Sequence, residues 1–507
     1  MGIDLINTIF GMKVRQARTE AGLTLTEMAA QCDLSPSYMT EIEKGRKYPR
    51  SDKIMRMAEV LGKDYDQMVS IKLPPSLSYL ESALSSSIMQ RFPFHEFGLE
   101  AEDLVNLLTR EPDRASALLH AILEIGRRYD LQEEDFLRAA LRSYQEFHEN
   151  YFPELEEAAQ QFQAEFGARY ELDGGRHYSP TTLRTLLEKE FNCEVDDKRI
   201  QTQPELNGYR SVFVPGKPGT LFVNGRLFPR QIRFLLAREL GYQYLGLQER
   251  TTTSPPEQID SFTQILNYFK ASYFGGALLM PRADLTAEID TFFNQSIWNP
   301  QPLLDMLDKY NVTPEMLLYR FSELVPQYFG IKLHFLRFHH VGHRFQLVKQ
   351  LNMNRLLVPS GIGLYEHYCR RWLSVRLLTD LEEQDQHMDN PHTGVQLSEF
   401  LESQERFLCI GFSRPLVLSS GVTSSVIVGF RVDADLPHTI RFVNDPAIPH
   451  TIINETCERC PLTAEQCHER AAAPSLLQAH QTRQARRLAL TQLAAGKPDP
   501  SEALVVV

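Results

Sequence analysis

Three of the seven cysteines stand close together near the C-terminus, as Cys457, Cys460 and Cys467. Two cysteines separated by two residues can bind one metal ion from a single turn, and a third can fold back onto the same ion. The pattern predicts zinc, or an iron–sulfur cluster, with Cys409, the adjacent His468 or a bound ligand in the fourth position. The alternative is a set of reduced structural thiols, because disulfides are disfavoured in the cytosol.

A second pattern with chemical meaning lies in residues 229–247, which read as a helix that begins with proline. Metallopeptidases carry H-E-x-x-H on such a helix, because histidines at i and i+4 share one face and the glutamate beside them can act as a base. Here Arg238 and Tyr242 occupy the two histidine positions, and Glu239 is kept. An arginine at a ligand position repels a dication. We therefore expect no peptidase activity, with Glu239 as a hydrogen-bonding residue.

The segment "NYFKASYFGGALLMP" follows at residues 267–281. With the helix before it, this segment resembles the ImmA/IrrE-type peptidases over about residues 205–285. In that family this second helix supplies the third metal ligand and closes with a similar sequence. The spacing puts that ligand near Tyr268 or Lys270, and neither residue suits zinc. The resemblance implies a degenerate, zincin-like peptidase fold that is kept as a scaffold or sensor.

His339 and His343 are four residues apart and offer another arrangement for a metal ion. The preceding residues, "IKLHFLRF", alternate between apolar and polar like a strand, and Gly342 suits a turn. These features argue against the helical geometry that an i, i+4 pair needs.

The first 62 residues hold the signals of a small helical domain. Thr24 and Glu27 form a capping box, and Ser35 followed by Pro36 reads as the start of a second helix. That second helix should stop at Gly45. The order of these signals over about 55 residues closely resembles the XRE (lambda-repressor-like) helix-turn-helix family. The alternative is a helical bundle used only for protein contact.

That resemblance implies a set of DNA-contacting residues. The start of the recognition helix should face base edges, and cations around it should meet phosphates. The first group is Ser35, Ser37, Tyr38 and Thr40, and Thr24 at the start of the preceding helix is a further candidate DNA-binding residue outside both groups. The second group is Arg15, Arg18, Lys44, Arg46, Lys47 and Arg50.

Composition limits the class of protein. The 507 residues allow two to four domains, and their net charge is −12, so DNA contact must come from a local patch. Residues 1–70 hold ten Lys/Arg and ten Asp/Glu, so even there the cations must gather on one face. The sequence has no apolar run of about 18 residues and no signal-like start, so we expect a soluble, cytoplasmic protein with no membrane contact.

We expect a multidomain chain: an all-α helix-turn-helix headpiece at 1–70 and a helical linker or dimerisation segment at 76–170. A degenerate α+β peptidase-like domain should follow at 175–340. An α+β ligand-sensing domain with the cysteine cluster should span 341–480, with a helical or disordered tail at 481–507. In the sensing domain we expect a helix at 363–381 and strands at 406–413, 415–420 and 424–432.

The four pieces in this order resemble the short-chain fatty acid transcriptional regulator family, and Arg470 and Pro474 complete its "CxxC…C…R…P" signature. The resemblance implies control of carbon or short-chain acyl metabolism, with an acyl-CoA-like effector. Our hypothesis is ligand-gated binding of a homodimer to a double-stranded DNA operator. Two alternatives stay open: a metallopeptidase that cleaves a partner repressor through non-standard ligands, and a DNA-tethered protein-interaction module.

Overall fold

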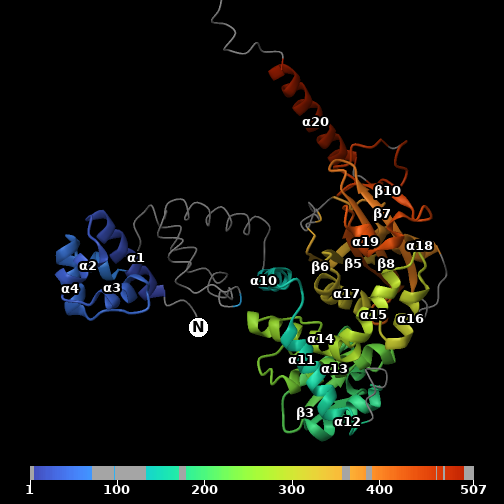
Figure 1. The fold of residues 1–507 in the computed structure, drawn as a ribbon, viewed down its shortest axis with the longest axis horizontal. Coiled ribbons are helices and arrows are strands. Elements are labelled where there is room, and N and C mark those ends of the chain that lie inside the picture. Colours follow the sequence, from blue (N-terminus) through green and yellow to red (C-terminus); the bar gives the residue numbers. More distant parts are fainter. Residues whose placement is uncertain are drawn as a thin grey trace, which may run out of the picture. The chain divides into compact units, whose positions relative to one another are not determined.

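The computed structural model describes residues 5–70, 96, 133–170, 178–354, 356, 366–383, 391–463, 465–471 and 474–495. The chain divides into two compact units. One comprises Met1–Tyr144 and Gln258–Leu266, and the other comprises Gln145–Glu257 and Asn267–Val507. Figure 1 labels their helices and strands.

Five helices form the N-terminal domain, which the sequence predicts to be helical. They are α1 (Leu5–Glu20), α2 (Leu25–Gln31), α3 (Pro36–Glu43), α4 (Ser51–Leu61) and α5 (Tyr65–Val69). The capping box is present, since Thr24 Oγ1 accepts from the Glu27 amide and Glu27 Oε2 accepts from the Thr24 amide. Ser35 caps α3 by accepting from the Tyr38 amide. Buried apolar side chains from α1 to α5 form one core.

The helical segment that follows is described in part. Residues 71–132 lie outside the described part, apart from Glu96. Helices α10 (Glu133–Phe147) and α11 (Pro153–Phe166) are present. The three- and four-residue spacing of apolar residues predicts one packed face through Phe136, Ala140, Tyr144, Phe147 and Tyr151. Of these, Ala140 and Tyr144 are buried, but Phe147 is 68% exposed. The buried stripe passes instead through Leu137, so Phe147 lies outside it.

The peptidase-like part places helices beside a small sheet. Its strands are β1 (Cys193–Asp196), β2 (Ser211–Val214), β3 (Gly219–Val223) and β4 (Thr253–Ser254), in the order β1-β3-β2-β4. Strands β1 and β3 are parallel, and β2 is antiparallel to both β3 and β4. The helices are α12 (Pro180–Glu190), η3 (Arg199–Thr202), η4 (Pro204–Leu206), α13 (Pro229–Tyr244) and α14 (Phe262–Leu279).

The C-terminal part contains a six-stranded sheet in the order β10-β7-β8-β9-β5-β6. Its strands are β5 (Leu333–Val341), β6 (Arg344–Asn352), β7 (His392–Phe400), β8 (Arg406–Pro415), β9 (Val422–Arg431) and β10 (His450–Ile453). The preceding helices are α15 (Arg282–Phe293), α16 (Gln301–Tyr310) and α17 (Pro314–Phe329). The later ones are α18 (Leu373–Glu383), α19 (Leu436–Thr439), η5 (Arg441–Asn444) and α20 (Pro474–Ala495).

Helices α17 and α18 pack against this sheet through two separate apolar cores, which places them on opposite faces. Phe335 and Phe321 belong to the α17 core, whereas Leu336 and Leu377 belong to the α18 core. Adjacent residues of β5 thus enter different cores, as strand geometry requires. Figure 1 shows α17 and α18 beside the strands.

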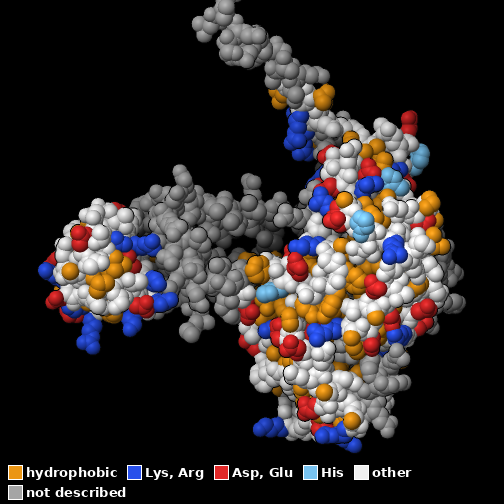
Figure 2. Space-filling view, in the orientation of Figure 1, with side chains coloured by type: hydrophobic (Ala, Val, Ile, Leu, Met, Phe, Trp, Pro, Cys, Tyr) orange, Lys and Arg blue, Asp and Glu red, His pale blue; other side chains and the backbone are white. Residues whose placement is uncertain are grey.

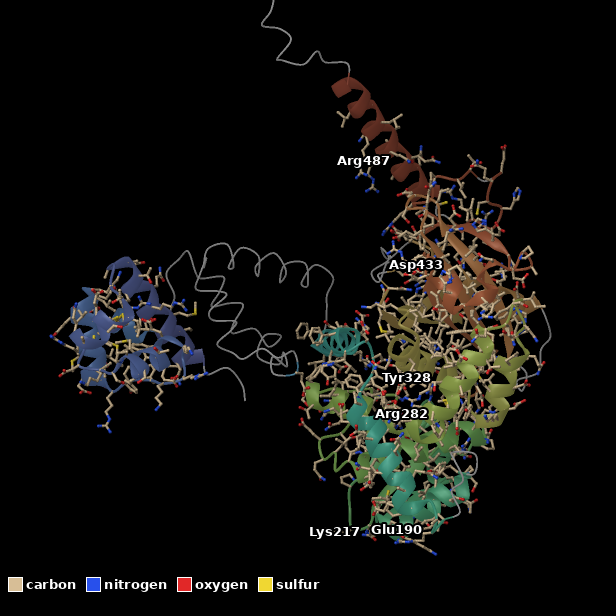
Figure 3. All side chains as sticks on the ribbon, in the orientation of Figure 1. Glu190, Lys217, Arg282, Tyr328, Asp433 and Arg487 are labelled. Carbon is tan, nitrogen blue, oxygen red and sulfur yellow. The ribbon has the colours of Figure 1, made fainter. Side chains whose placement is uncertain are left out.

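Charged and polar side chains also join the helices that precede the sheet. Arg320 of α17 is fully buried and donates to Glu156 of α11 at 2.6 and 2.9 Å and to Glu323 at 2.7 Å. Nearby, the hydroxyls of Tyr151 and Tyr328 lie 3.1 Å apart, and Arg282 donates to Tyr151. Figure 3 labels Arg282 and Tyr328 close together in this region.

Three expectations need correction. The helix predicted at 363–381 begins at Leu373, because Tyr368 pairs with Thr456 in a β-bridge instead. The predicted strand 415–420 is mostly the connection between β8 and β9. The domain boundary predicted between 340 and 341 falls inside the β5–β6 hairpin, and β5 pairs with β9, so β5 belongs with the C-terminal sheet. No described helix has the length and hydropathy needed to cross a membrane.

Candidate DNA interface and peptidase-like site

The start of α3 carries the residues predicted to read bases. Ser35 and Ser37 are exposed, and Tyr38 and Thr40 are half-buried. The Ser35 hydroxyl is engaged in the cap, and the Thr40 hydroxyl donates to the Pro36 carbonyl at 2.9 Å. Among the described residues, the Ser37 hydroxyl contacts Ser35 Oγ alone, at 3.1 Å. Ser37 is therefore the hydroxyl of this group that is best placed to contact an external partner.

Several predicted phosphate-binding cations surround this helix. Arg46, Lys47 and Arg50 are exposed in the connection between α3 and α4. Arg46 pairs with Glu41 at 3.2 Å, and Lys47 Nζ lies 5.9 Å from the centre of the Tyr38 ring. Arg15 and Lys44 are half-buried. Figure 2 shows Lys and Arg mixed with Asp and Glu on this domain, in keeping with its balanced charge.

Arg18 has a structural role that the sequence interpretation missed, and Thr24 has the capping role that the sequence predicts. Arg18 Nε and Nη2 donate to the two carboxylate oxygens of Glu43 at 2.5 and 3.0 Å, and Nη1 donates to the Leu23 carbonyl. The side chains of Arg18 and Glu43 are 15% and 6% exposed. The hydrogen bonds that Arg18 donates to Glu43 raise the pKa of Arg18. The assignment of Arg18 to phosphate is therefore corrected, because its donors join α1 to α3. The Thr24 hydroxyl is used by the capping box.

In the peptidase-like part, Arg238 lies at the first histidine position of the motif and is buried. Its Nη1 donates to Ser254 Oγ at 2.8 Å and to Tyr268 Oη at 2.9 Å, and its Nη2 donates to Ser211 Oγ at 3.1 Å. Tyr268 is one of the two residues that spacing placed at the third ligand position. The structure thus brings the first and third ligand positions together, with a guanidinium group bonded to a phenol.

Close packing of two helices holds this contact. A Cβ atom on Gly241 of α13 would lie 2.8 Å from the Ala271 carbonyl oxygen of α14. A Cβ atom on Gly275 of α14 would lie 3.0 Å from the Arg238 amide nitrogen. The contact at Gly241 is shorter than real Cβ atoms show, and the one at Gly275 is tighter than most, so the two glycines let α13 and α14 approach each other at the level of Arg238.

Glu239, the residue that acts as a base in active peptidases, is held in an ion pair. Arg250 donates to both of its carboxylate oxygens at 2.8 and 2.6 Å, and Gln243 donates to Oε1 at 2.8 Å. The Arg250 guanidinium lies 3.6 Å from the centre of the Phe213 ring and 4.0 Å from that of Tyr242. Arg250 was not predicted, because no motif marks a residue that follows the helix.

A pocket of about 470 Å³ opens beside these residues. Phe213, Tyr242 and Arg250 line it, together with Cys193 and Gln243. Burial raises the pKa of Tyr242 to about 12, so its phenol stays protonated near neutral pH. Neither Arg238 nor Tyr242 offers the neutral nitrogen ligand that zinc requires at these positions. The residues at the motif therefore do not fit a catalytic zinc ion.

The three clustered cysteines are buried free thiols. Their loop also approaches Cys369, whose amide donates to the Glu455 carbonyl at 3.3 Å. Burial raises the pKa of Cys369 to about 12, and the neighbouring thiols of Cys457 and Cys460 add to this rise. Sequence reasoning placed Cys369 inside a helix and so missed it as a neighbour of the cluster.

The other predicted members of the cysteine site lie differently. Cys409 is in β8, where it accepts from Ser398 at 3.7 Å, and it lines a small separate cavity with His334. His468 is exposed. Arg470 of the predicted signature donates to the carbonyls of Cys457, Cys460 and Leu462, so it shapes the loop. Thiolate sulfur is a good zinc ligand. Within the described ranges, however, no three His, Cys, Asp or Glu side chains are grouped so that they could hold a metal ion.

The histidines at 339–343 lie on the strand and turn that the sequence predicts. His340 of β5 contacts Glu382 at 2.5 Å and stacks on Phe345, and Gly342 has a φ of +60° in the turn. His339 and His343 therefore do not share a helix face. Burial lowers the pKa of His339 to about 4, and the charge of Arg337 lowers it as well.

Comparisons with known proteins agree with the geometry of the N-terminal domain. The helix-turn-helix domain family matches residues 9–68. The control protein C.BamHI of Bacillus amyloliquefaciens is 34% identical over 58 residues, which are 11% of this chain and 72% of that protein. The chain belongs to the helix-turn-helix family of regulators. The prediction of a DNA-binding transcriptional regulator is thereby confirmed.

This helix-turn-helix regulator carries a second recognisable domain. The IrrE N-terminal-like domain family matches residues 195–322, which confirms the resemblance predicted for 205–285. A Mycobacterium tuberculosis transcriptional regulator is similar in structure, with a TM-score of 0.47 and 17% identity. That similarity covers 65% of this chain and 92% of the other.

Proposed function

We propose that the chain is a sequence-specific transcriptional regulator that binds DNA as a homodimer and responds to a small-molecule effector. The observation that carries the DNA half is the exposed start of α3, where Ser37 lies beside the exposed cations Arg46, Lys47 and Arg50. In helix-turn-helix proteins this helix enters the major groove, and a dimer reads two half-sites about 34 Å apart. Backbone contacts then give affinity, and contacts from α3 give specificity.

The effector half rests on the order of the sequence motifs. The signature around Cys457 and the degenerate peptidase segment together support a short-chain acyl or carbon-metabolism regulator with an acyl-CoA-like effector. An effector changes DNA affinity only as far as it binds one arrangement of the dimer better than another. The response to a small molecule and the role in acyl metabolism therefore form one proposal. This proposal is tested separately from DNA binding.

Selection of bound DNA from a random pool tests the DNA half with the full chain. We expect one enriched motif for the wild-type protein and a changed base preference for Ser37→Ala. Arg46→Gln should weaken binding to all sequences. The slope of log affinity against log salt concentration (the salt slope) should become shallower by about one. Thr19→Ala is the matched control, because it removes an exposed hydroxyl from α1. Failure to enrich any motif would refute sequence-specific binding.

We further propose that the IrrE-like domain does not hydrolyse peptides through zinc. The support is the guanidinium of Arg238 at a ligand position and the engagement of Glu239 by Arg250. An arginine there opposes a dication, and both carboxylate oxygens of Glu239 already accept charge-assisted hydrogen bonds from Arg250. Metal analysis and a peptidase assay on wild type and Glu239→Gln test this proposal. Stoichiometric zinc in the wild type, together with peptidase activity that is lost in Glu239→Gln, would establish the enzyme instead.

A further inference from the structure

The face of the six-stranded sheet that packs on α17 changes from apolar to charged along its strands. Phe335, Ile410 and Val428 belong to the apolar core beneath α17. Arg337 follows Phe335 by two residues and therefore lies on the same face. The register of β5 with β6 places Lys349 directly opposite Arg337.

The next row of the same face continues the pattern. His339 of β5 lies opposite Ser424 of β9, and Ser424 lies opposite Arg414 of β8. A small cavity of about 10 Å³ lies among Arg414, Ser424 and Glu315. The charged end of the sheet thus faces the first turn of α17, which carries Glu315.

Among the described cations of this sheet face, Arg337 alone is paired with an acid. Arg337 donates to Glu315 at 2.9 Å and to Ser424 Oγ at 3.2 Å. Within the residues that the structure describes, Lys349 and Arg414 form no ion pair. Lys349 Nζ instead lies 3.5 Å from the centre of the Tyr319 ring.

A fourth cation comes from the IrrE-like part. Arg210 directly precedes β2, and its amide donates to the Ser254 carbonyl at 2.6 Å. No acid pairs with Arg210 in the described part of the chain. We call Arg210, Arg337, Lys349, Arg414 and Glu315 together the cation recess.

The pKa shifts show that these groups act on one another. Burial alone would raise the pKa of Glu315, but the four cations together lower it to about 2. Burial lowers the pKa of Arg414 to about 10, and Arg337 and Arg210 oppose its charge further. Burial also lowers the pKa of Lys349.

Water nevertheless reaches the recess. The Lys349 side chain is exposed, and Arg210, Glu315 and Arg414 keep part of their surface accessible. A ligand of small size can therefore approach the cations from solvent.

Three cations without acid partners, beside a carboxylate that is already paired, leave an excess of positive charge at this end of the sheet. Such charges are costly to bury, and like charges opposite each other on neighbouring strands repel. Strongly perturbed groups gathered in a recess mark candidate ligand sites. We propose that the cation recess binds the phosphate or pyrophosphate group of a small molecule.

Phosphate chemistry matches the number and type of donors. A phosphate monoester carries about −1.5 to −2 charge at pH 7 and three acceptor oxygens. Guanidinium groups such as those of Arg210 and Arg414 bind phosphate through two parallel hydrogen bonds, and the Lys349 ammonium adds a point charge. One carboxylate would neutralise one of the three unpaired cations, whereas a pyrophosphate neutralises all of them.

The position of the recess suits a regulatory ligand. Arg210 belongs to the IrrE-like sheet, while Lys349 and Arg414 belong to the C-terminal sheet. A bound phosphate group contacts both parts and favours the arrangement that brings them together. This inference deepens the effector half of the proposed function and depends on it for its regulatory meaning. Ligand binding itself is measured without DNA.

Calorimetric titration of the full-length protein with inorganic pyrophosphate, at an ionic strength held constant with potassium chloride, tests the proposal. We expect saturable binding at one site per chain, weakened about ten-fold or more by Lys349→Gln and by Arg414→Gln. Without ligand, both variants should unfold at a temperature equal to or above that of wild type, because each relieves repulsion. Arg199→Gln is the matched control, since Arg199 is exposed and pairs with Asp196 elsewhere.

Three results would overturn the proposal. The first is no binding of pyrophosphate beyond that of chloride. The second is an equal loss of binding in Arg199→Gln. The third is equal binding of the tricarboxylate tricarballylate, which would exclude a phosphate-specific site. DNA selection is a separate experiment. A failure to bind pyrophosphate would leave the proposed DNA binding standing, and a failure of DNA selection would leave the proposed phosphate site standing.

Discussion

Arg18 gives the sharpest contrast between the interpretation from sequence and the structure. If Arg18 contacts phosphate, its removal weakens DNA binding and reduces the salt slope by about one. In the structure its guanidinium instead satisfies both oxygens of Glu43, whose side chain is 6% exposed. Arg18→Ala leaves that carboxylate nearly buried and unpaired. Breaking a buried ion pair costs about 3–5 kcal/mol, and the residual exposure of Arg18 reduces this to about 2–4 kcal/mol.

Hydrogen–deuterium exchange of the full chain measures this loss locally, since peptides from residues 5–70 report the opening of their own domain. A loss of about 3 kcal/mol should speed exchange of the most protected amides in α1 and α3 roughly 100-fold. Lys63→Ala is the control, because its pair with Glu20 is exposed and worth at most about 1 kcal/mol. Unchanged exchange in Arg18→Ala, with a salt slope reduced by one, would refute the structural role.

Three further predictions concern the rest of the chain. Burial lowers the pKa of His334 to about 4, so between pH 6.5 and 4 the unfolded chain binds the extra proton and the folded chain does not. Stability should therefore fall by up to about 3 kcal/mol as pH drops through that window, and His334→Gln should flatten the loss measured by thermal unfolding; equal pH profiles would contradict this. Gly241→Ala should lower the free energy of unfolding by about 1–3 kcal/mol, because its Cβ would meet the Ala271 carbonyl. Gly276→Ala should leave the free energy of unfolding unchanged, because a Cβ there meets nothing within 4 Å. If the thiol cluster binds zinc, elemental analysis should find zinc that is lost in Cys457→Ser; the same zinc content in both proteins would exclude the cluster as its site.

Local signals predicted the elements that depend on neighbouring residues. The capping box at Thr24 and the Ser35-Pro36 start fix α2 and α3, because caps act within one helical turn. Pro229 fixes the start of α13 in the same way. The spacing from Arg238 to Tyr268 indicated two ligand positions that the fold indeed brings into contact.

Features that depend on distant partners could not be predicted. Arg18 looks like any surface arginine of a DNA-binding domain until Glu43 is placed beside it. Arg250 and Glu239 meet because the chain turns back after α13, which no motif signals. The cation recess joins residues that are separated by up to about two hundred positions, and its charge emerges only from the register of the strands.

The salt dependence of DNA binding tests the central claim most directly. The measurement is fluorescence anisotropy of the full-length protein on a DNA duplex recovered by selection, at salt concentrations between 50 and 200 mM. If a dimer contacts six to ten phosphates, affinity should fall roughly 10³- to 10⁵-fold over this range, and a scrambled duplex should bind more weakly throughout. Affinity that does not change with salt, or equal affinity for the scrambled duplex, would contradict sequence-specific DNA binding by the exposed face of α3.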